Sequence, residues 1–221
     1  MTKLDAAGHT FPRAPSGEEV ANGNWSRDYE FRGAVVKQSL AFYLKSAVCS
    51  AWFRLRGVKS SFVVCEGHLP VLYTHGTAAI GWRFILRGYT IPSEIGTKNR
   101  NARLQIGDRV FINQGASVLA TSYIEIGDDC LIGDFAAVYD TNWHAVDSES
   151  PTRSAPVIIG NNVWICRGVT VLPGSKIGDH TVVAAGSVVK GDLPPRVLAA
   201  GNPAVVVREL KISDGWRRPE A

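Results

Sequence analysis

The middle of the chain repeats an aliphatic residue every six positions, and this period constrains the fold more than any other feature. Counting from residue 106 and restarting where the phase breaks, fourteen positions lead to residue 189, and thirteen of them are Ile or Val. These are Ile106, Ile112, Val118, Ile124, Ile126, Ile132, Val138, Ile159, Ile165, Val171, Ile177, Val183 and Val189. The period fits neither a helix, at about 3.6 residues per turn, nor a strand alternating about every two residues.

Short strands separated by turns explain the period. Glycine followed by Asp or Asn comes after the aliphatic residue, at Gly107, Gly127, Gly133, Gly160 and Gly178, and these residue types favour turns. Three six-residue steps close a triangular coil with the aliphatic side chains inside, and successive coils pair at about 4.8 Å. One coil cannot bury its apolar side alone, so several must stack. We therefore predict a mainly β protein whose regular part, residues 106–191, is a parallel β-helix.

The segments on either side of the repeat are less regular. Residues 1–33 are polar and contain several Gly and Pro, which predicts a loose tail. Residues 34–105 are expected to hold a helix over 35–56, an irregular first coil and a basic loop. Residues 192–221 contain paired prolines and then Gly201-Asn202-Pro203, which predicts a cap and a short extension that is exposed at its end.

The predicted helix has two interpretations. Its apolar positions have helical spacing: Leu40, Tyr43, Leu44, Ala47, Val48, Ala51, Trp52 and Leu55. Such a stripe usually packs on its own subunit or on a neighbouring copy. The basic residues along its edge also suit peripheral contact with an anionic membrane, and these are Lys37, Lys45, Arg54, Arg56 and Lys59.

Composition excludes several classes of protein. Lys and Arg number 24 against 20 Asp and Glu, and this net charge of +4 requires no nucleic acid partner. A chain that is 45% hydrophobic and 20% charged is typical of a folded globular protein. No apolar run of about 18 residues exists to span a bilayer. The first residues also lack the apolar core of a signal peptide, so we expect a cytoplasmic protein.

The one repeat position that is neither Ile nor Val is His144, and the longest insertion, residues 145–158, follows it. An imidazole in an inward or corner position loses burial energy and needs hydrogen bonds, and a long loop contributes nothing to coil stacking. The two departures together indicate a functional site with His144 as general base, since His titrates nearest neutral pH. The structural alternative is a histidine satisfied at the mouth of a surface loop.

Four polar residues beside His144 are candidates for orienting its ring, namely Asp140, Asn142, Asp147 and Glu149. Asp140 and Asn142 could instead hold a hydroxyl-bearing acceptor. Turn chemistry explains each of them equally well, because Asp and Asn commonly close turns.

Nucleophilic and metal-dependent chemistry are both disfavoured. The four cysteines lack CxxC spacing and are expected to be reduced and mostly buried, and Cys166 stands at a crowded repeat position without an assigned base. A metal site needs three convergent ligands, whereas the repeat offers only His144 and His180 as imidazoles. We predict no metal.

Several motifs together resemble those of the hexapeptide-repeat acyltransferases, which are left-handed parallel β-helices. The resemblance is greatest to the maltose and galactoside O-acetyltransferases and to enzymes that modify polysaccharides. The motifs, which lie in nearly half the chain, are IGDDCLIG, DTNWH before the insertion, IIGNNVWI, VTVLPGSKIGDHTVVAAGSVV, DLPP and AAGNPA. The left hand comes from this resemblance alone, because crossovers between parallel strands are usually right-handed.

The resemblance implies an acyl-CoA-dependent O-acyltransferase that uses acetyl-CoA and acts on a sugar, glycan or glycolipid hydroxyl. It implies a homotrimer with active sites between subunits and His144 as general base. Asn113, in INQG, would bind the acceptor. The coenzyme would lie along the coils near Trp164, reaching the turn at Ala185 and Gly186 and the basic C-terminal end.

Three departures from the family pattern concern the coenzyme. Lys190 is displaced by one position from the usual lysine, Cys166-Arg167 follows VWI in place of Ser or Gly, and Val205 replaces an arginine, leaving Arg208. The candidate coenzyme contacts are therefore Trp164, Arg167, Gly168, Ala185, Gly186, Lys190 and Arg208.

Three other functions are compatible with this fold. The first is N-acylation of an amino sugar or small amine. The second is a zinc enzyme of the γ-carbonic anhydrase type, which binds zinc with three histidines from neighbouring subunits; this chain lacks the matching trio. The third is a non-catalytic β-helix scaffold, which would bind no coenzyme A.

Overall fold

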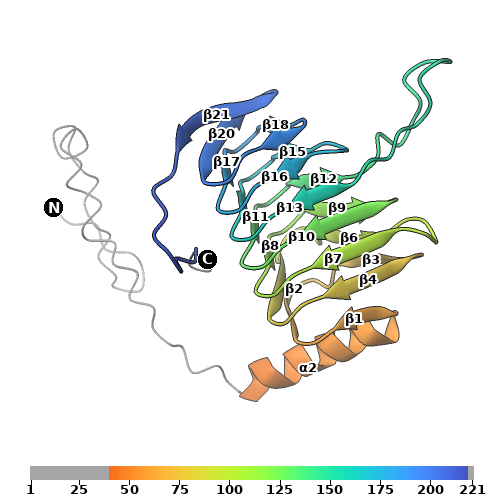
Figure 1. The fold of residues 1–221 in the computed structure, drawn as a ribbon. Coiled ribbons are helices and arrows are strands. Elements are labelled where there is room, and N and C mark those ends of the chain that lie inside the picture. The colour runs from red at the N-terminus through yellow and green to blue at the C-terminus, as the bar shows by residue number, and fades with distance from the viewer. Residues whose placement is uncertain (1–39, 219–221) are drawn as a thin grey trace, which may run out of the picture. The chain divides into compact units, whose positions relative to one another are not determined.

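The computed structural model describes residues 40–218, which form one helix followed by a triangular prism of strands (Figure 1). Helix α2 is Leu40–Leu55. Each turn of the following coil contributes one strand to each of three sheets, so the prism has three faces. The fold is the left-handed parallel β-helix that the sequence predicted. Within residues 40–218 no helix has the length and apolar character needed to cross a bilayer.

Each face is a ladder of short strands from successive coils. The first face contains β1 (Val58–Ser60), β4 (Thr77–Ile80), β7 (Arg103–Ile106), β10 (Tyr123–Ile126), β13 (Val157–Ile159), β16 (Lys176–Ile177) and β19 (Asp192–Leu193). The second contains β2 (Val63–Gly67), β5 (Phe84–Gly88), β8 (Phe111–Ile112), β11 (Leu131–Ile132), β14 (Trp164–Ile165), β17 (Val182–Val183), β20 (Val197–Gly201) and β21 (Ala204–Glu209). The third contains β3 (Val71–Thr74), β6 (Glu94–Thr97), β9 (Ser117–Ala120), β12 (Ala137–Tyr139), β15 (Thr170–Val171) and β18 (Val188–Val189).

The core of the prism consists of the repeated aliphatic side chains. All thirteen Ile and Val residues of the six-residue period are buried, and none is more than 4% exposed. On the first face Ile106, Ile126 and Ile159 stand in direct register, one above the other. Burial of one such side chain contributes about 1.5–3 kcal/mol, so these columns supply the energy that holds neighbouring coils together. The inward orientation predicted from the period is confirmed.

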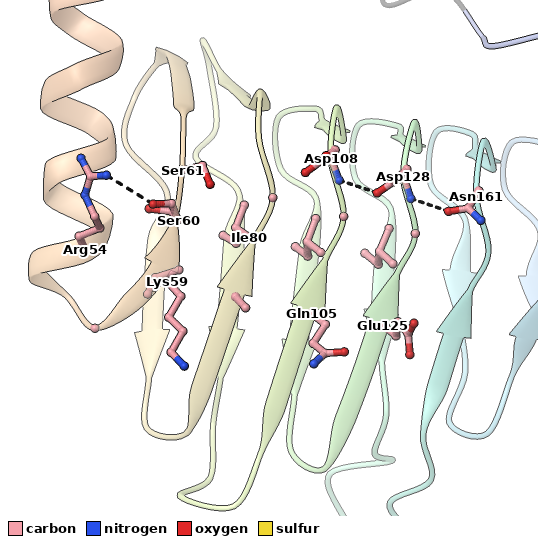
Figure 2. A pocket seen from close by; sticks show the side chains of 18 residues that line it. Arg54, Lys59, Ser60, Ser61, Ile80, Gln105, Asp108, Glu125, Asp128 and Asn161 are labelled. Carbon is pink, nitrogen blue, oxygen red and sulfur yellow. Dashed lines mark hydrogen bonds between the residues drawn. The ribbon is translucent and has the colours of Figure 1, made fainter.

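The corner between the first and second faces explains why glycine precedes Asp or Asn. The side-chain oxygen of each Asp or Asn accepts a hydrogen bond from the backbone of the coil before it. The Asp108 N–H donates to Asp128 Oδ1 at 2.7 Å, and the Asp128 N–H donates to Asn161 Oδ1 at 2.9 Å (Figure 2). A Cβ on Gly127 would lie 2.6 Å from Asn161 Oδ1. Glycine therefore leaves room for this oxygen.

The left-handed backbone positions at this corner are not glycines. They are Arg83, Arg109, Asp129, Asn162, His180 and Arg196, with φ between 55° and 61°. The N–H of Asn162, for example, donates to Asp128 O at 2.7 Å. The sequence analysis attributed these glycines to the backbone conformation of a turn. That explanation is corrected for this corner, where glycine is needed because a Cβ would clash with the next coil. We call it the sealed corner, comprising residues 81–83, 107–110, 127–130, 160–163, 178–181 and 194–196.

Two coils precede residue 106, where the regular repeat was predicted to begin. Their strands pair in parallel register with the next coil, β4 with β7 and β5 with β8. At the other end, β20 and β21 form an antiparallel pair that closes the prism. The tail predicted for residues 1–33, and residues 35–39 of the predicted helix, lie outside the described residues.

Helix α2 packs on the first coil through a face that the sequence did not predict. Its buried residues are Ser46, Cys49, Ser50 and Phe53. Ser50 Oγ accepts a hydrogen bond from the Val63 N–H at 2.9 Å, and the Phe53 ring contacts that of Phe84. Apart from half-buried Trp52, the predicted apolar stripe faces solvent, because the small serine side chains allow the helix to lie close to the strands.

Candidate active site

The largest interruption of the prism is the loop between β12 and β13, residues 140–156, which carries His144. It leaves the corner between the third and first faces as a narrow ribbon. Thr141 and Ser154 pair as an antiparallel bridge, and the Asn142 N–H donates to Arg153 O at 3.2 Å. Figure 1 shows this ribbon, in green, projecting away from the coils.

His144 is exposed on this ribbon and does not occupy an inward or corner position of the prism. The prediction of its position is corrected, because the chain leaves the coil after β12 and the six-residue count then no longer applies. The His144 N–H donates to Asn142 O at 2.6 Å. Trp143 before it is left-handed, with φ of 57°, and its ring lies edge-on against Tyr139. The imidazole is accordingly accessible to a substrate.

Asp140 closes the base of the loop. Its carboxylate is fully buried and accepts three hydrogen bonds, from the Thr121 N–H and hydroxyl at 2.8 Å each and from the Ser122 N–H at 2.6 Å. Asn142 Oδ1 likewise accepts from the Arg153 N–H at 2.8 Å. Both side chains thus stabilise the ribbon, and among the described residues no hydrogen bond joins the His144 ring to a carboxylate.

The other two predicted carboxylates lie near the tip of the ribbon. Asp147 Oδ1 accepts from the Glu149 N–H at 2.9 Å. The pKa of Asp147 is lowered by hydrogen bonds, first from the Ser150 side chain and then from the Glu149 backbone. Asp147 therefore shapes the tip as an ionised acceptor, while Glu149 is exposed.

The corner between the second and third faces collects five of the predicted site residues. In chain order these are Asn113, then, two coils later, Arg167 with Gly168, and in the next coil Ala185 with Gly186. Gly168 donates its N–H to Asp134 O, and Gly186 to Arg167 O, each at 2.9 Å. We call this the open corner, comprising residues 113–116, 133–136, 166–169 and 184–187.

Glycine has a different role at the open corner. Gly168 and Gly186 are left-handed, with φ of 64° and 71°, and a Cβ on either would meet nothing within 4 Å. The backbone is therefore bare on its outer side, which permits close approach of a ligand. Beside it, Arg167 is 69% exposed and pairs with Asp134 at 2.9 Å.

Two further candidates share one row on the second face. The strand registers align Trp164 with Val182, Val182 with Leu198, and Leu198 with Arg208. Trp164 is 40% exposed and Arg208 is exposed. An aromatic surface and a cation are thus on the same face of the prism. Lys190 is separate from them, because it follows β18 at the other edge of the third face.

The C-terminal segment adds a contact that the sequence analysis missed. The Arg218 guanidinium lies 5.5 Å from the centre of the Trp164 ring and 4.9 Å from that of Trp216. The Arg218 N–H donates to Asn162 Oδ1 at 3.0 Å, and Asn162 Nδ2 donates to Trp216 O at 3.1 Å. Burial lowers the pKa of Arg218. The segment is largely exposed, as predicted, but Trp216 and Arg218 are half-buried, and the tryptophan in an otherwise polar tail was the available signal.

The predicted residues do not converge within one chain. His144 lies on the ribbon that leaves the corner between the third and first faces, and Lys190 lies at that corner, whereas Asn113 and Gly168 lie at the open corner. The third face separates them. Its strand β9 has four residues, which span roughly 13 Å. Within one chain, His144 and the open corner therefore lie on opposite sides of the third face.

A groove of about 930 Å³ lies elsewhere, over the first face beside the end of α2 (Figure 2). Arg54 and Lys59 line one side, and Gln105 and Glu125 project from the neighbouring strands. None of the predicted site residues lines this groove. Its size alone does not make it the reaction site.

The cysteines offer no activated nucleophile. All four are unpaired, as predicted, with Cys166 partly exposed and the others buried. Burial raises the pKa of Cys130 to about 12 and raises that of Cys166, which the charge of Arg218 opposes. Within residues 40–218 no three His, Cys, Asp or Glu side chains group in a way that could hold a metal ion.

Comparison with known proteins identifies the repeat. The pattern described as bacterial transferase hexapeptide (six repeats) matches residues 156–191. This chain contains the hexapeptide repeat of bacterial transferases. The match covers strands β13 to β18. It includes segments 160–163 and 178–181 of the sealed corner and segments 166–169 and 184–187 of the open corner. The resemblance predicted from the sequence motifs is confirmed.

Curated relatives of the hexapeptide-repeat chain are acetyltransferases. Galactoside O-acetyltransferase of Escherichia coli is 36% identical over 116 residues, which are 51% of this chain and 57% of the relative. Galactoside O-acetyltransferase of Lactococcus lactis is 33% identical over 126 residues, 55% of this chain and 58% of the relative. The chain thus spans little more than half the length of these relatives.

A solved structure supports the fold. A mutant of the N-acyltransferase AntD from Bacillus cereus, in complex with dTDP and coenzyme A, matches with a TM-score of 0.58. The match has 17% sequence identity and covers 73% of this chain and 88% of that chain. At this identity the likeness concerns the architecture alone.

Proposed function

We propose that this protein is an O-acyltransferase that moves an acyl group, expected to be acetyl, from coenzyme A to a hydroxyl of a sugar or glycan. The observation that carries the proposal is His144, an exposed imidazole on a ribbon that projects from a hexapeptide-repeat prism. The galactoside O-acetyltransferases among the relatives favour a hydroxyl acceptor.

The proposed site lies between copies of the chain in a homotrimer. The ribbon carries His144 away from its own coils, and the open corner presents Asn113 and bare glycine backbone on the far side of the third face. A neighbour would bring its open corner to the ribbon. Asn113 is half-buried and its Oδ1 accepts from the Gln114 N–H at 2.9 Å, and its amide N–H groups would donate to the acceptor.

The open corner also fits the coenzyme. Because no atom stands over Gly168 and Gly186, an extended chain such as a pantetheine arm can lie in contact with their backbone. Arg167 and Arg208 on one copy, with Lys190 at the opposite edge of its neighbour, would supply cations for the phosphates. Trp164 would form an apolar wall, its outer surface shared with Arg218.

His144 would act as a general base. Its neutral imidazole accepts the proton of the acceptor hydroxyl while that oxygen attacks the thioester carbonyl. The carbon–sulfur bond then breaks, the new ester remains on the acceptor, and the imidazolium returns the proton to the departing thiolate. The Gly168 N–H does not serve as an oxyanion donor, because it already donates to Asp134 O. General base catalysis of this kind contributes about 10²–10⁴-fold.

The test is His144→Gln, with the exposed His68→Gln as matched control. Coenzyme release is measured from acetyl-CoA with a panel of sugars, glycolipids and amino sugars, and oligomer mass is measured by ultracentrifugation. We expect kcat to fall by about 10²–10⁴ in His144→Gln, with unchanged mass, and to stay normal in His68→Gln.

Three results would contradict the proposal. A folded His144→Gln variant with near-normal kcat removes the imidazole from the reaction. Absence of coenzyme A binding by calorimetry favours a non-catalytic scaffold. Release with amino sugars alone would place the activity in N-acylation.

A further inference from the structure

Helix α2 presents an apolar surface that no described residue covers. Leu40, Leu44, Val48 and Leu55 are 76%, 60%, 69% and 87% exposed. At about 100° per residue they form one stripe along the helix, on the side opposite the buried Ser46 and Phe53. With Ala51 between them, the stripe extends over most of the helix. We call these residues the α2 stripe.

Helix α2 packs on the prism through its other side, without contacts from this stripe. On its packed side the Ser46 hydroxyl donates to Phe42 O at 2.8 Å and the Ser50 hydroxyl to Ser46 O at 2.7 Å. Ser50 also anchors β2 through the Val63 N–H. The large apolar side chains are therefore not needed for docking to the coil, and a contiguous apolar surface of this kind marks an interaction site.

Charge indicates what covers the stripe. Residues 40–59 contain four cations and no Asp or Glu. Lys45 and Arg54 lie on opposite flanks of the stripe, about a quarter turn from its centre, and Arg56 and Lys59 follow the helix. An apolar stripe with cations on both flanks suits the headgroup region of an anionic bilayer.

The same charges disfavour a two-fold contact between the α2 helices of two copies. A symmetric contact through α2 would place the same surface on both sides. Four cations of one copy would then face four of the other, without an acidic residue from this segment to separate them. Like charges brought together across an interface oppose association.

We propose that α2 is a membrane-docking helix that lies in the plane of an anionic lipid surface. Its stripe enters the headgroup and acyl boundary, and Lys45 and Arg54 contact lipid phosphates. The helix is bound at the surface and does not cross it. The proposal does not depend on the acyl transfer proposed above.

The experiment is cosedimentation of the full chain with vesicles made of equal parts phosphatidylcholine and phosphatidylglycerol, with phosphatidylcholine vesicles as comparison. We expect binding to the mixed vesicles that weakens as salt rises. The variant Leu44→Ser with Val48→Ser removes two exposed side chains and should bind at least about tenfold more weakly. The control is Val205→Ser with Val207→Ser on β21, of similar exposure at 61% and 58%, which should bind like the unchanged chain.

Three outcomes would overturn the proposal. One is no sedimentation of the full chain with mixed vesicles, or equal binding to phosphatidylcholine alone. Another is unchanged binding of the stripe variant. The third is a change of oligomer mass in the stripe variant without vesicle binding by the full chain, which assigns the stripe to a second copy. Coenzyme release with a water-soluble acceptor is measured alongside, so that loss of acyl transfer is distinguished from loss of lipid binding.

Discussion

The sealed corner and the last two coils of the open corner, at Gly168 and Gly186, use glycine for opposite reasons. At the sealed corner glycine makes room for a side-chain oxygen of the next coil, and non-glycine residues such as Asn162 take the left-handed conformation. At the open corner Gly168 and Gly186 are themselves left-handed, with empty space outside them. The first arrangement holds coils together, while the second leaves a backbone surface free for a ligand.

Among the substitutions that test this comparison, Gly127→Ala is expected to cause the largest loss of stability. Gly127→Ala would place a methyl group 2.6 Å from Asn161 Oδ1 and 2.8 Å from the Gly160 backbone, so the coils must shift apart locally. Overpacking of this kind costs about 1–3 kcal/mol. Urea denaturation followed by circular dichroism measures it, and coenzyme affinity of the folded protein should be unchanged. Stability equal to that of the unchanged chain would show that the sealed corner is not rigid.

A smaller loss of stability, with a specific loss of binding, is expected at Gly186. Gly186→Ala meets no atom, so only the left-handed backbone penalty of about 1 kcal/mol applies. Its methyl group would obstruct a coenzyme lying on the backbone, and we expect affinity to fall about tenfold or more.

The matched control for Gly186 is Gly57→Ala. Gly57 is also left-handed, with φ of 85° and no neighbour within 4 Å, but it lies between α2 and β1. Its stability loss should be similar and its coenzyme affinity normal by calorimetry. Equal affinities in the two variants would remove the open corner from coenzyme binding.

The smallest effect is expected at Arg217, which reaches the sealed corner from the C-terminal segment. Its guanidinium lies 3.6 Å from Asp129 and is 66% exposed, and Arg109 already holds the same carboxylate at 2.7 Å. Arg217→Gln should therefore change stability by less than about 0.5 kcal/mol. Arg109→Gln should cost about 1 kcal/mol. Thermal unfolding compares the two, and equal losses would contradict this ranking.

The prism was predictable because the residues that repeat every six positions are the ones that are buried. Each Ile or Val of the repeat points inward, so counting residues was equivalent to following the coil, from Ile106 to Val189. The count failed at His144, where the chain leaves the coil and no longer follows its period. The packed face of α2 also escaped prediction, since burial there depends on two serines that hydrogen-bond to backbone.

The candidate site was predictable only in its parts. Motifs near Trp164 and Gly186 singled out residues that lie on the second face and at the open corner, but their separation from His144 by a whole face requires coordinates. Arg218 illustrates the same limit. Its contact with Trp164 joins residues 54 positions apart, through a tail that crosses the corner at Asn162.

Asp140 has a consequence for how such a protein can diversify. Its three hydrogen bonds complete the turn at Thr121 and Ser122 from inside the prism, and the Thr141–Ser154 bridge then ties the two legs of the ribbon together. The residues of the ribbon beyond this bridge therefore take no part in the packing of the coils. The segment that carries His144 can therefore be lengthened, shortened or exchanged without disturbing the coils that present it.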